Sequence, residues 1–298
     1  MASPRDIKKR IKGVKNIQQI TRTMEMVAGA KLRRSQSAAQ HARPYAEKIN
    51  SMVHSLGKAA GNIQHPLLKD RPVKKIALAV LTSNKGLCGA FNGNILRKAE
   101  DNVLRHASKE YMLFCVGKKA RDYFSRRGYK IKKSYMPSDR ELELSLIIEL
   151  VKDLSEGFEK GEYDQVDLIY SQFVSPMVQR PTSLTLIPFT KPSEEEAEQQ
   201  QRKAEKDKKA AGDYLFEPEP EELMAELIPK YLESQVYNAL AQTQAGEHAA
   251  RLVAMKSASD NAKEVIHTLT LSYNKARQAS ITKEILEIVS GSEAIKAG

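Results

Sequence analysis

The sequence contains no tryptophan, and aromatic residues make up only 6% of its 298 residues, whereas charged residues make up 29%. This mixture favours long solvated helices over one large compact core. No apolar run approaches the ~20 residues that a helix needs to cross a bilayer, and the first residues form no apolar signal region. We therefore expect a chain without direct membrane insertion, which works where it is made or is held at a membrane by its partners.

Motifs for enzymatic chemistry are also missing. The two cysteines, Cys88 and Cys115, make neither a disulfide framework nor a metal site, and both lie in apolar stretches typical of core positions. None of the six histidines has the spacing of a zinc-protease motif. The glycine turn at 86–89 lacks the residues of a phosphate or dinucleotide loop, so a tight strand-to-helix connection explains it better. The sequence therefore predicts no catalytic residue, no cofactor and no metal.

The first fifty-odd residues have the period of a long helix. Ser3 is a good N-cap and Pro4 suits the first helical position. We expect Pro44 to bend this helix rather than end it, because a spaced apolar pattern continues beyond it. Apolar residues recur at steps of three and four, at Ile7, Ile11, Val14, Ile17, Ile20, Met24 and Val27.

A second long helix is predicted at the other end of the chain. Residues 230–290 contain no proline and one glycine, Gly246. The stripe of this helix includes Leu252, Met255, Ala262, Val265, Leu269, Ala276, Ile281, Ile285 and Ile288. Most of its other residues are small, so the helix is slim. We predict that the helices of domains 1–57 and 223–298 pair as an antiparallel coiled coil, with Met24 beside the C-terminal half of the second helix.

Between these helices, strand and helix patterns alternate over residues 73–190, and one of the predicted helices spans about 139–159. This alternation predicts a Rossmann-like α/β domain with a mainly parallel sheet covered on both faces. Residues 191–222 change character, with 6 Lys/Arg and 11 Asp/Glu, and form a polar linker with a more apolar island at 213–218. The fold class is thus α/β with long helices.

The positive charge is unevenly distributed. The net charge is +11, and residues 1–50 alone hold 12 Lys/Arg against 3 Asp/Glu, whereas residues 223–298 hold 8 of each. An anionic partner would therefore lie near the first helix. A solvated face that keeps the protein soluble explains the same pattern. A basic coiled-coil protein that binds nucleic acid is the alternative function, although the chain lacks a basic surface motif with aromatic residues.

The most specific segment is residues 275–291, KARQASITKEILEIVSG. It resembles the signature of gamma subunits of rotary F-type ATP synthases, in which Ile/Val-Thr-x-Glu is followed by an acidic residue and then Gly-Ala. Matching positions are Ile281, Thr282, Glu284, Glu287 and Gly291, and Ser292 stands where the family has Ala. Four other stretches resemble the same family in order along the chain: 20–28, 86–89, 213–218 and 233–237.

The resemblance implies a central stalk that turns inside a hexamer of alpha and beta subunits, couples proton flow to ATP synthesis and holds no catalytic site itself. It implies that Arg277, Gln278 and Thr282, with Met24 on the first helix, contact the beta subunits. An apolar tip at Ile285, Ile288 and Val289 would sit in a hydrophobic sleeve of the hexamer. The basic first helix would face an acidic loop of the beta subunits. The island residues Tyr214, Phe216 and Glu217 would meet the epsilon subunit and the membrane c-ring.

The resemblance also implies a location on the cytoplasmic face of the bacterial inner membrane, held there by partners. The family's plastid members carry a cysteine-bearing regulatory insert near the linker, and this chain has no cysteine after Cys115. With no transit peptide visible, we expect a bacterial source, and a processed organellar chain is the alternative. Nucleic acid is not expected as a partner. A small α/β enzyme is a third reading, and it would need a pocket ligand that the sequence does not suggest.

Overall fold

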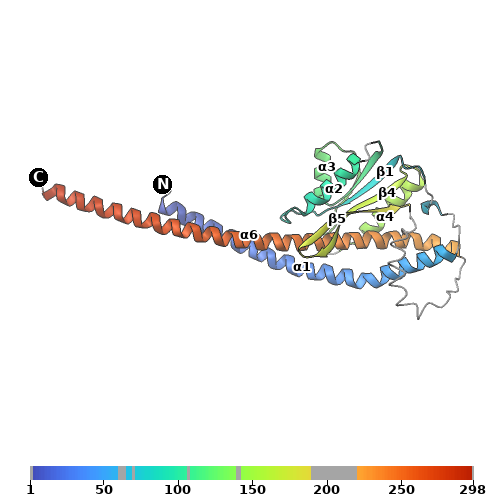
Figure 1. Ribbon diagram of the computed structural model, residues 1–298, viewed down its shortest axis with the longest axis horizontal. Coiled ribbons are helices and arrows are strands. Elements are labelled where there is room, and N and C mark those ends of the chain that lie inside the picture. Colours follow the sequence, from blue (N-terminus) through green and yellow to red (C-terminus); the bar gives the residue numbers. More distant parts are fainter. Residues whose placement is uncertain are drawn as a thin grey trace. The chain divides into compact units, whose positions relative to one another are not determined.

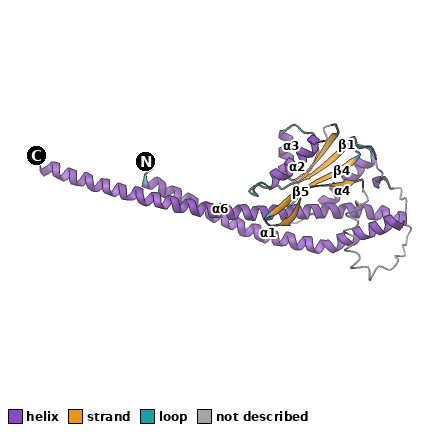
Figure 2. Ribbon diagram, viewed as in Figure 1, coloured by secondary structure: helices purple, strands orange, loops and turns teal. Residues whose placement is uncertain are grey.

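A computed structural model describes residues 3–59, 65–68, 71–105, 108–138, 142–188 and 220–296. Its elements are α1 (Pro4–Ala59), η1 (Pro66–Leu68), β1 (Lys75–Leu81), α2 (Phe91–Arg105), β2 (Glu110–Val116), α3 (Lys118–Arg126), β3 (Ile131–Tyr135), α4 (Leu144–Glu159), β4 (Gln165–Ser175), β5 (Val178–Ile187) and α6 (Pro220–Lys296) (Figures 1 and 2). The two long terminal helices and the α/β region between them confirm the predicted fold class.

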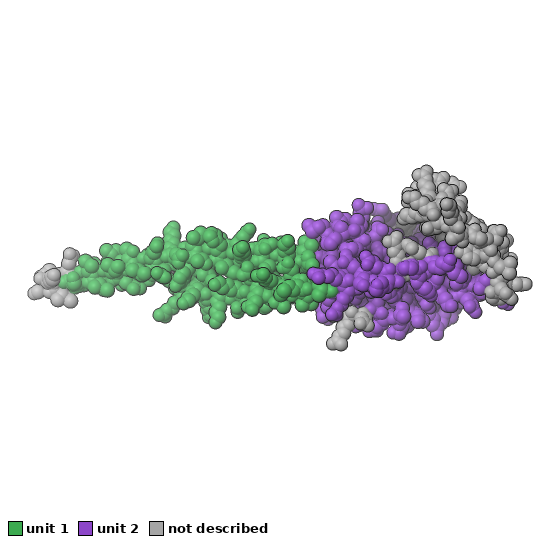
Figure 3. Space-filling view, turned by 90° about the horizontal axis from the view of Figure 1, so that it is seen from below, with its two compact units in different colours: residues 1–30, 251–298 green, residues 31–250 purple. Residues whose placement is uncertain are grey.

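The chain divides into two compact units (Figure 3). One unit contains residues 1–30 and 251–298, and we call it the two-helix unit. The other contains residues 31–250, and we call it the α/β unit. Both units include parts of α1 and α6, so the division falls within the long helices. The domain boundaries predicted from the sequence, which assign each long helix to a domain of its own, stay a prediction.

The sheet has the order β3-β2-β1-β4-β5. Strands β3, β2, β1 and β4 pair in parallel, and β5 pairs antiparallel with β4 at one edge. The chain moves from β1 through β2 to β3 on one side and then returns to place β4 on the other side of β1. The mainly parallel sheet predicted from strand–helix alternation is therefore confirmed, with one antiparallel edge strand added by a hairpin.

Both faces of the sheet are covered. On one face, α4 and the first part of α6 pack on apolar side chains of all the parallel strands, together with Ile49 and Val53 of α1. On the other face, α2 and α3 cover a second core that includes both cysteines. A strand buried on both faces reads as a continuous apolar run, as β1 does.

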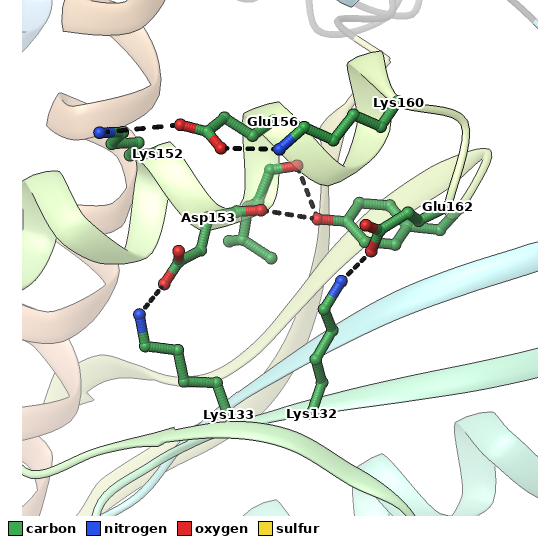
Figure 4. Close-up of polar contacts among 9 residues, drawn as sticks. Lys132, Lys133, Lys152, Asp153, Glu156, Lys160 and Glu162 are labelled. Carbon is green, nitrogen blue, oxygen red and sulfur yellow. Dashed lines mark hydrogen bonds and ion pairs between the residues drawn. The ribbon is translucent and has the colours of Figure 1, made fainter.

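Edge strand β3 is held by charged side chains. Lys132 pairs with Glu162, and Lys133 pairs with Asp153 of α4 (Figure 4). Lys133 also pairs with Glu149 of the same helix. Tyr135 also donates a hydrogen bond to Asp153. Lysines on an edge strand discourage pairing with another chain, and here Lys133 also ties the strand to α4.

The helix boundaries differ from the predicted ones by a few residues. Helix α1 continues through Pro44 and ends at Ala59, as the apolar pattern beyond the proline indicates. Helix α6 begins at Pro220, because proline suits a first helical turn. Helix α4 begins only at Leu144, since Glu143 before it has an extended backbone, whereas the sequence pattern suggested a start near residue 139.

Candidate interaction surface

In the two-helix unit, α1 and α6 pack closely through small residues. Ala28 is 2% exposed, and a Cβ built on Gly29 would lie 3.2 Å from the Cδ1 atom of Leu252. Met255 and Ala262 are also buried. Small side chains on α1 therefore let a leucine of α6 approach its backbone.

Beyond this contact, the C-terminal part of α6 leaves large apolar side chains exposed. The exposed fractions are 44% for Ile281, 55% for Ile285, 60% for Leu286, 71% for Ile288 and 48% for Val289. Ile285, Ile288 and Val289 continue the three–four spacing from Ile281, so they form one stripe, and we call these three residues the apolar tip. Contiguous exposed apolar surface of this kind marks a place where a protein meets a partner.

Polar residues lie next to the apolar tip on the same helix. Arg277 and Gln278 are exposed, and the described part of the chain offers the Arg277 guanidinium no hydrogen bond or ion pair. Thr282 is exposed too, but its hydroxyl donates to the Gln278 carbonyl at 3.0 Å. On α1, Met24 is half-buried. Arg277 therefore has its charge available for an external group.

The first turns of α1 carry a basic face. Side chains of Arg5, Lys8, Lys9, Lys12 and Lys15, with Ile11, line an open hollow on this face. No ion pair joins any of these five cations to a carboxylate within the described ranges. Unpaired charges of one sign at helical spacing attract an anionic surface.

The glycine turn after β1 places two residues in the left-handed region of the backbone. Gly89 has φ 57°, in the left-handed region, and Leu87 has φ 63°. The first N–H groups of α3 bond to this segment: Lys118 N–H donates to Asn84 Oδ1 at 3.0 Å and Ala120 N–H to Thr82 Oγ1 at 2.9 Å. A helix N-terminus is a common phosphate site in such folds, and here these donors are already used.

The remaining chemical inventory agrees with core roles. Burial raises the pKa of the Cys115 thiol to about 12, and Cys88 is equally buried. Among the residues described, no group of three His, Cys, Asp or Glu side chains could hold a metal. No helix among them is long and apolar enough to cross a membrane. The island residues Tyr214, Phe216 and Glu217 lie outside the described residues.

Comparisons with known proteins assign the chain to a family. The family model described as ATP synthase matches residues 3–295. The ATP synthase gamma chain of Desulforamulus reducens is 46% identical over 296 residues, which are 99% of this chain and 100% of the relative. The chain belongs to the ATP synthase gamma chain family. Another gamma chain, from Pelotomaculum thermopropionicum, is 44% identical over the same shares of both chains.

Solved structures agree with the family. The central stalk and c-ring structure of the Tetrahymena thermophila mitochondrial ATP synthase matches with a TM-score of 0.60 and 26% identity, over 80% of this chain and 99% of that chain. A chain of the Euglena gracilis mitochondrial ATP synthase matches with a TM-score of 0.66 over 99% of this chain, and at 20% identity it supports the fold alone. The gamma chain resemblance read from residues 275–291 is thus confirmed.

The structure brings most of the predicted site residues together on α6. Arg277, Gln278 and Thr282 and the predicted tip residues lie within four turns of that helix. Sequence reasoning omitted Leu286, which is as exposed as its neighbours. Its place within the apolar cluster Ile285, Ile288 and Val289 is the signal that could have identified it.

Proposed function

We propose that this chain is the central-stalk rotor subunit of an F-type ATP synthase, which couples ion flow across a membrane to ATP synthesis on surrounding catalytic subunits. The observation that carries the proposal is the exposed apolar tip of α6, in a chain whose full length matches ATP synthase gamma chains. In this role the chain catalyses no reaction itself. It changes the conformation of subunits that do.

The apolar tip suits a rotating bearing. Ile285, Ile288 and Val289 expose side chains that form no directional bonds, so a hydrophobic sleeve could surround them at every angle with similar energy. Hydrophobic contact depends on buried area rather than direction. The tip would therefore keep the two-helix unit, which forms the shaft of the rotor, in place and would offer little resistance to its rotation.

Arg277 and Gln278 suit the opposite task. A guanidinium forms forked, charge-assisted hydrogen bonds whose strength depends on direction. Bonds from Arg277 to a carboxylate or carbonyl of the hexamer would form at some angles and break at others. Such a catch, with Thr282 on the next turn of α6, would link the angle of the shaft to the state of a catalytic subunit. Met24 on α1 would contact the same subunits at another level of the shaft.

The other partners follow from charge and family. The basic face of α1, including Arg5 and Lys12, would meet an acidic surface of the beta subunits. Tyr214, Phe216 and Glu217 would contact the epsilon subunit and the membrane c-ring. The chain would then lie at the cytoplasmic face of a bacterial inner membrane, held by its partners rather than inserted. This assignment leaves nucleic acid with no role, since family membership explains the basic helix without it.

Purification of the full chain with its partners is the first test. We expect a stable complex with a hexameric ATPase. Recovery of nucleic acid without an ATPase would support the basic coiled-coil alternative instead. DNA binding by the isolated chain would not decide between the two functions, because any basic protein binds DNA in a salt-dependent way.

Replacement of Arg277 and Gln278 by Ala then tests the catch. The double variant should fold and assemble, because changes on an exposed helix face usually cost under ~0.5 kcal/mol. ATP turnover or proton pumping by the assembled complex should fall. If the assembled double variant hydrolyses ATP, synthesises ATP and pumps protons at wild-type rates, these residues form no catch.

A further inference from the structure

Strand β4 extends beyond the end of its parallel neighbour. Pairing between β1 and β4 ends at Val80 and Ile169, whereas β4 continues to Ser175 with only β5 beside it. Ser171 lies in this extension and is 1% exposed. Its N–H would have no strand partner on the side that β1 has left, and a buried donor without a partner is costly.

Helix α6 supplies the missing partner. The Thr243 hydroxyl oxygen accepts a hydrogen bond from the Ser171 N–H at 3.3 Å, and the same hydroxyl donates to the Ala239 carbonyl of its own helix at 2.8 Å. Both groups are buried. The sheet edge is therefore completed by one side chain of α6, whose direction is fixed by its own second hydrogen bond.

One turn further along α6, Gly246 lets three neighbouring elements come close to the helix backbone. A Cβ built on Gly246 would lie 3.0 Å from Cε2 of Phe91, 3.4 Å from Cγ of Gln179 and 3.6 Å from Oγ of Ser171. These neighbours belong to α2, β5 and β4. Three elements of the α/β unit thus meet the helix where it has no side chain.

Leu32 of α1 supports the same stretch. Leu32 packs with Ala245 and Ala249 in a small buried cluster that also contacts Phe173 of β4. Ser35 on α1 and Gln244 on α6 approach to 3.4 Å between Oγ and Oε1. Helix α6 is therefore held from several directions between residues 243 and 249.

We propose that Thr243 and Gly246, with Ser171, Gln179 and Phe91, form a clamp that fixes α6 against rotation and sliding in the α/β unit, and so passes torque from that unit to the shaft. This inference rests on the proposed rotor function. The five residues act as positioning residues.

The clamp differs physically from the rest of the packing of α6. Earlier in the helix, Met224, Ile228, Leu232 and Val236 form a row of apolar contacts with the sheet and α4. Such contacts resist separation but have little directional preference. At the clamp, rotation by one residue would place Ala245 or Glu247 where only Gly246 fits, and would misalign the Thr243 hydrogen bond.

The test uses the assembled complex and two loosened variants, Thr243→Val and Gly246→Val. The matched control is Gly93→Ala, an exposed helical glycine of α2 with no atom within 4 Å of its added Cβ. We expect each loosened variant to assemble and hydrolyse ATP, with a loss of protons pumped per ATP and a wider angular fluctuation of a bead attached to the α/β unit. Gly93→Ala should match the wild type in all these measurements.

A reversible lock covers the case in which a loosened variant fails to fold. The short distance from the Gly246 Cβ position to Gln179 Cγ allows a disulfide in the double variant Gln179→Cys with Gly246→Cys. Under reduction this chain should pump fewer protons per ATP than the wild type. Oxidation should restore the ratio, and the single variant Gln179→Cys should not respond.

Three results would overturn the clamp. One is a normal pumping ratio in both loosened variants. Another is a parallel fall of assembly, hydrolysis and pumping, which indicates a purely structural role. The third is a double-cysteine complex in which oxidation leaves the ratio unchanged or lowers it. If the wild-type chain forms no complex with an ATPase, the proposed rotor function itself is wrong. The torque role of the clamp then fails with it, and this result is distinct from the three above.

Discussion

In the α/β unit the largest apolar side chains are inside, whereas in the two-helix unit many of them face solvent. Phe114 and Phe124 are 1% and 0% exposed, while Ile20 and Ile288 are 59% and 71% exposed. The α/β unit buries its apolar surface with its own sheet and helices. Two helices cover only the sides that face each other. The difference indicates that the α/β unit builds a core of its own, whereas the two-helix unit leaves much of its apolar surface for the partners proposed above.

The largest expected effect is a loss of stability in the α/β unit when Gly117 is replaced. This residue has φ 94°, and an added Cβ would lie 2.3 Å from the Thr82 carbonyl oxygen. The clash involves backbone, which cannot move aside, and the backbone conformation itself is strained for an alanine. We expect Gly117→Ala to lower the free energy of unfolding by ~3 kcal/mol or more, measured by urea denaturation. A variant that unfolds at the wild-type urea concentration would contradict the packing described for this turn.

Truncation of one apolar side chain in each unit sharpens the contrast. Leu78 is 0% exposed and Ile285 is 55% exposed. Leu78→Ala should cost about 2–5 kcal/mol of stability because it leaves a cavity in the core. Ile285→Ala should cost under ~0.5 kcal/mol in the isolated chain but should weaken assembly or turnover in the complex. Equal losses of stability in urea titrations of the two variants would remove the distinction between the units.

Acid should act mainly on the α/β unit, through Asp153. Burial alone would raise the pKa of this carboxyl, but hydrogen bonds from Lys133 and Tyr135 outweigh it and hold the pKa below its ordinary value. A lowered folded-state pKa gives stability that is present above the unfolded-state value and is lost as the pH falls through the folded-state value. Wild-type stability should therefore decline below about pH 4.

The variant Asp153→Asn isolates this acid effect. It cannot ionise, so it should be less stable than the wild type at pH 7, and the gap should narrow as the pH is lowered. Melting temperatures measured from pH 7 to pH 2.5 would show this. A gap of constant size across that range would mean that the charge of Asp153 contributes nothing to folding.

The smallest expected effect is the difference in stability gained by two Gly→Ala substitutions within the two-helix unit. An added Cβ at Gly13 meets no atom within 4 Å, whereas one at Gly29 would lie 3.2 Å from Leu252. Alanine is more favourable than glycine in a helix by about 0.5–1 kcal/mol, so Gly13→Ala should gain most of that amount. Gly29→Ala should gain less, because Leu252 must shift. Thermal melts followed by circular dichroism would detect the difference, and an equal gain at both sites would mean that the helices are not in close contact there.

Much of the fold and surface was readable from local sequence. The three–four spacing from Ile7 to Val27 predicts a helix, and α1 covers that whole stretch. Residues 275–291 indicated the family, and the full-length match to gamma chains agrees. The antiparallel direction of β5 was not predicted, because a parallel and an antiparallel edge strand have the same apolar alternation. The start of α4 was predicted too early, since apolar spacing does not report where the backbone becomes extended.

The sequence by itself determined where helices form, since helical period, capping and the scarcity of proline are local properties. It did not determine which side of a helix is covered. In one predicted stripe, Ile7 is 7% exposed whereas Ile17 is 55% exposed, because burial depends on what lies opposite. The contacts of Thr243 with Ser171, 72 residues away, and of Gly246 with Phe91 were likewise decided by tertiary structure alone. A hydroxyl that completes a sheet edge and a glycine that admits an aromatic ring have meaning only beside those distant partners.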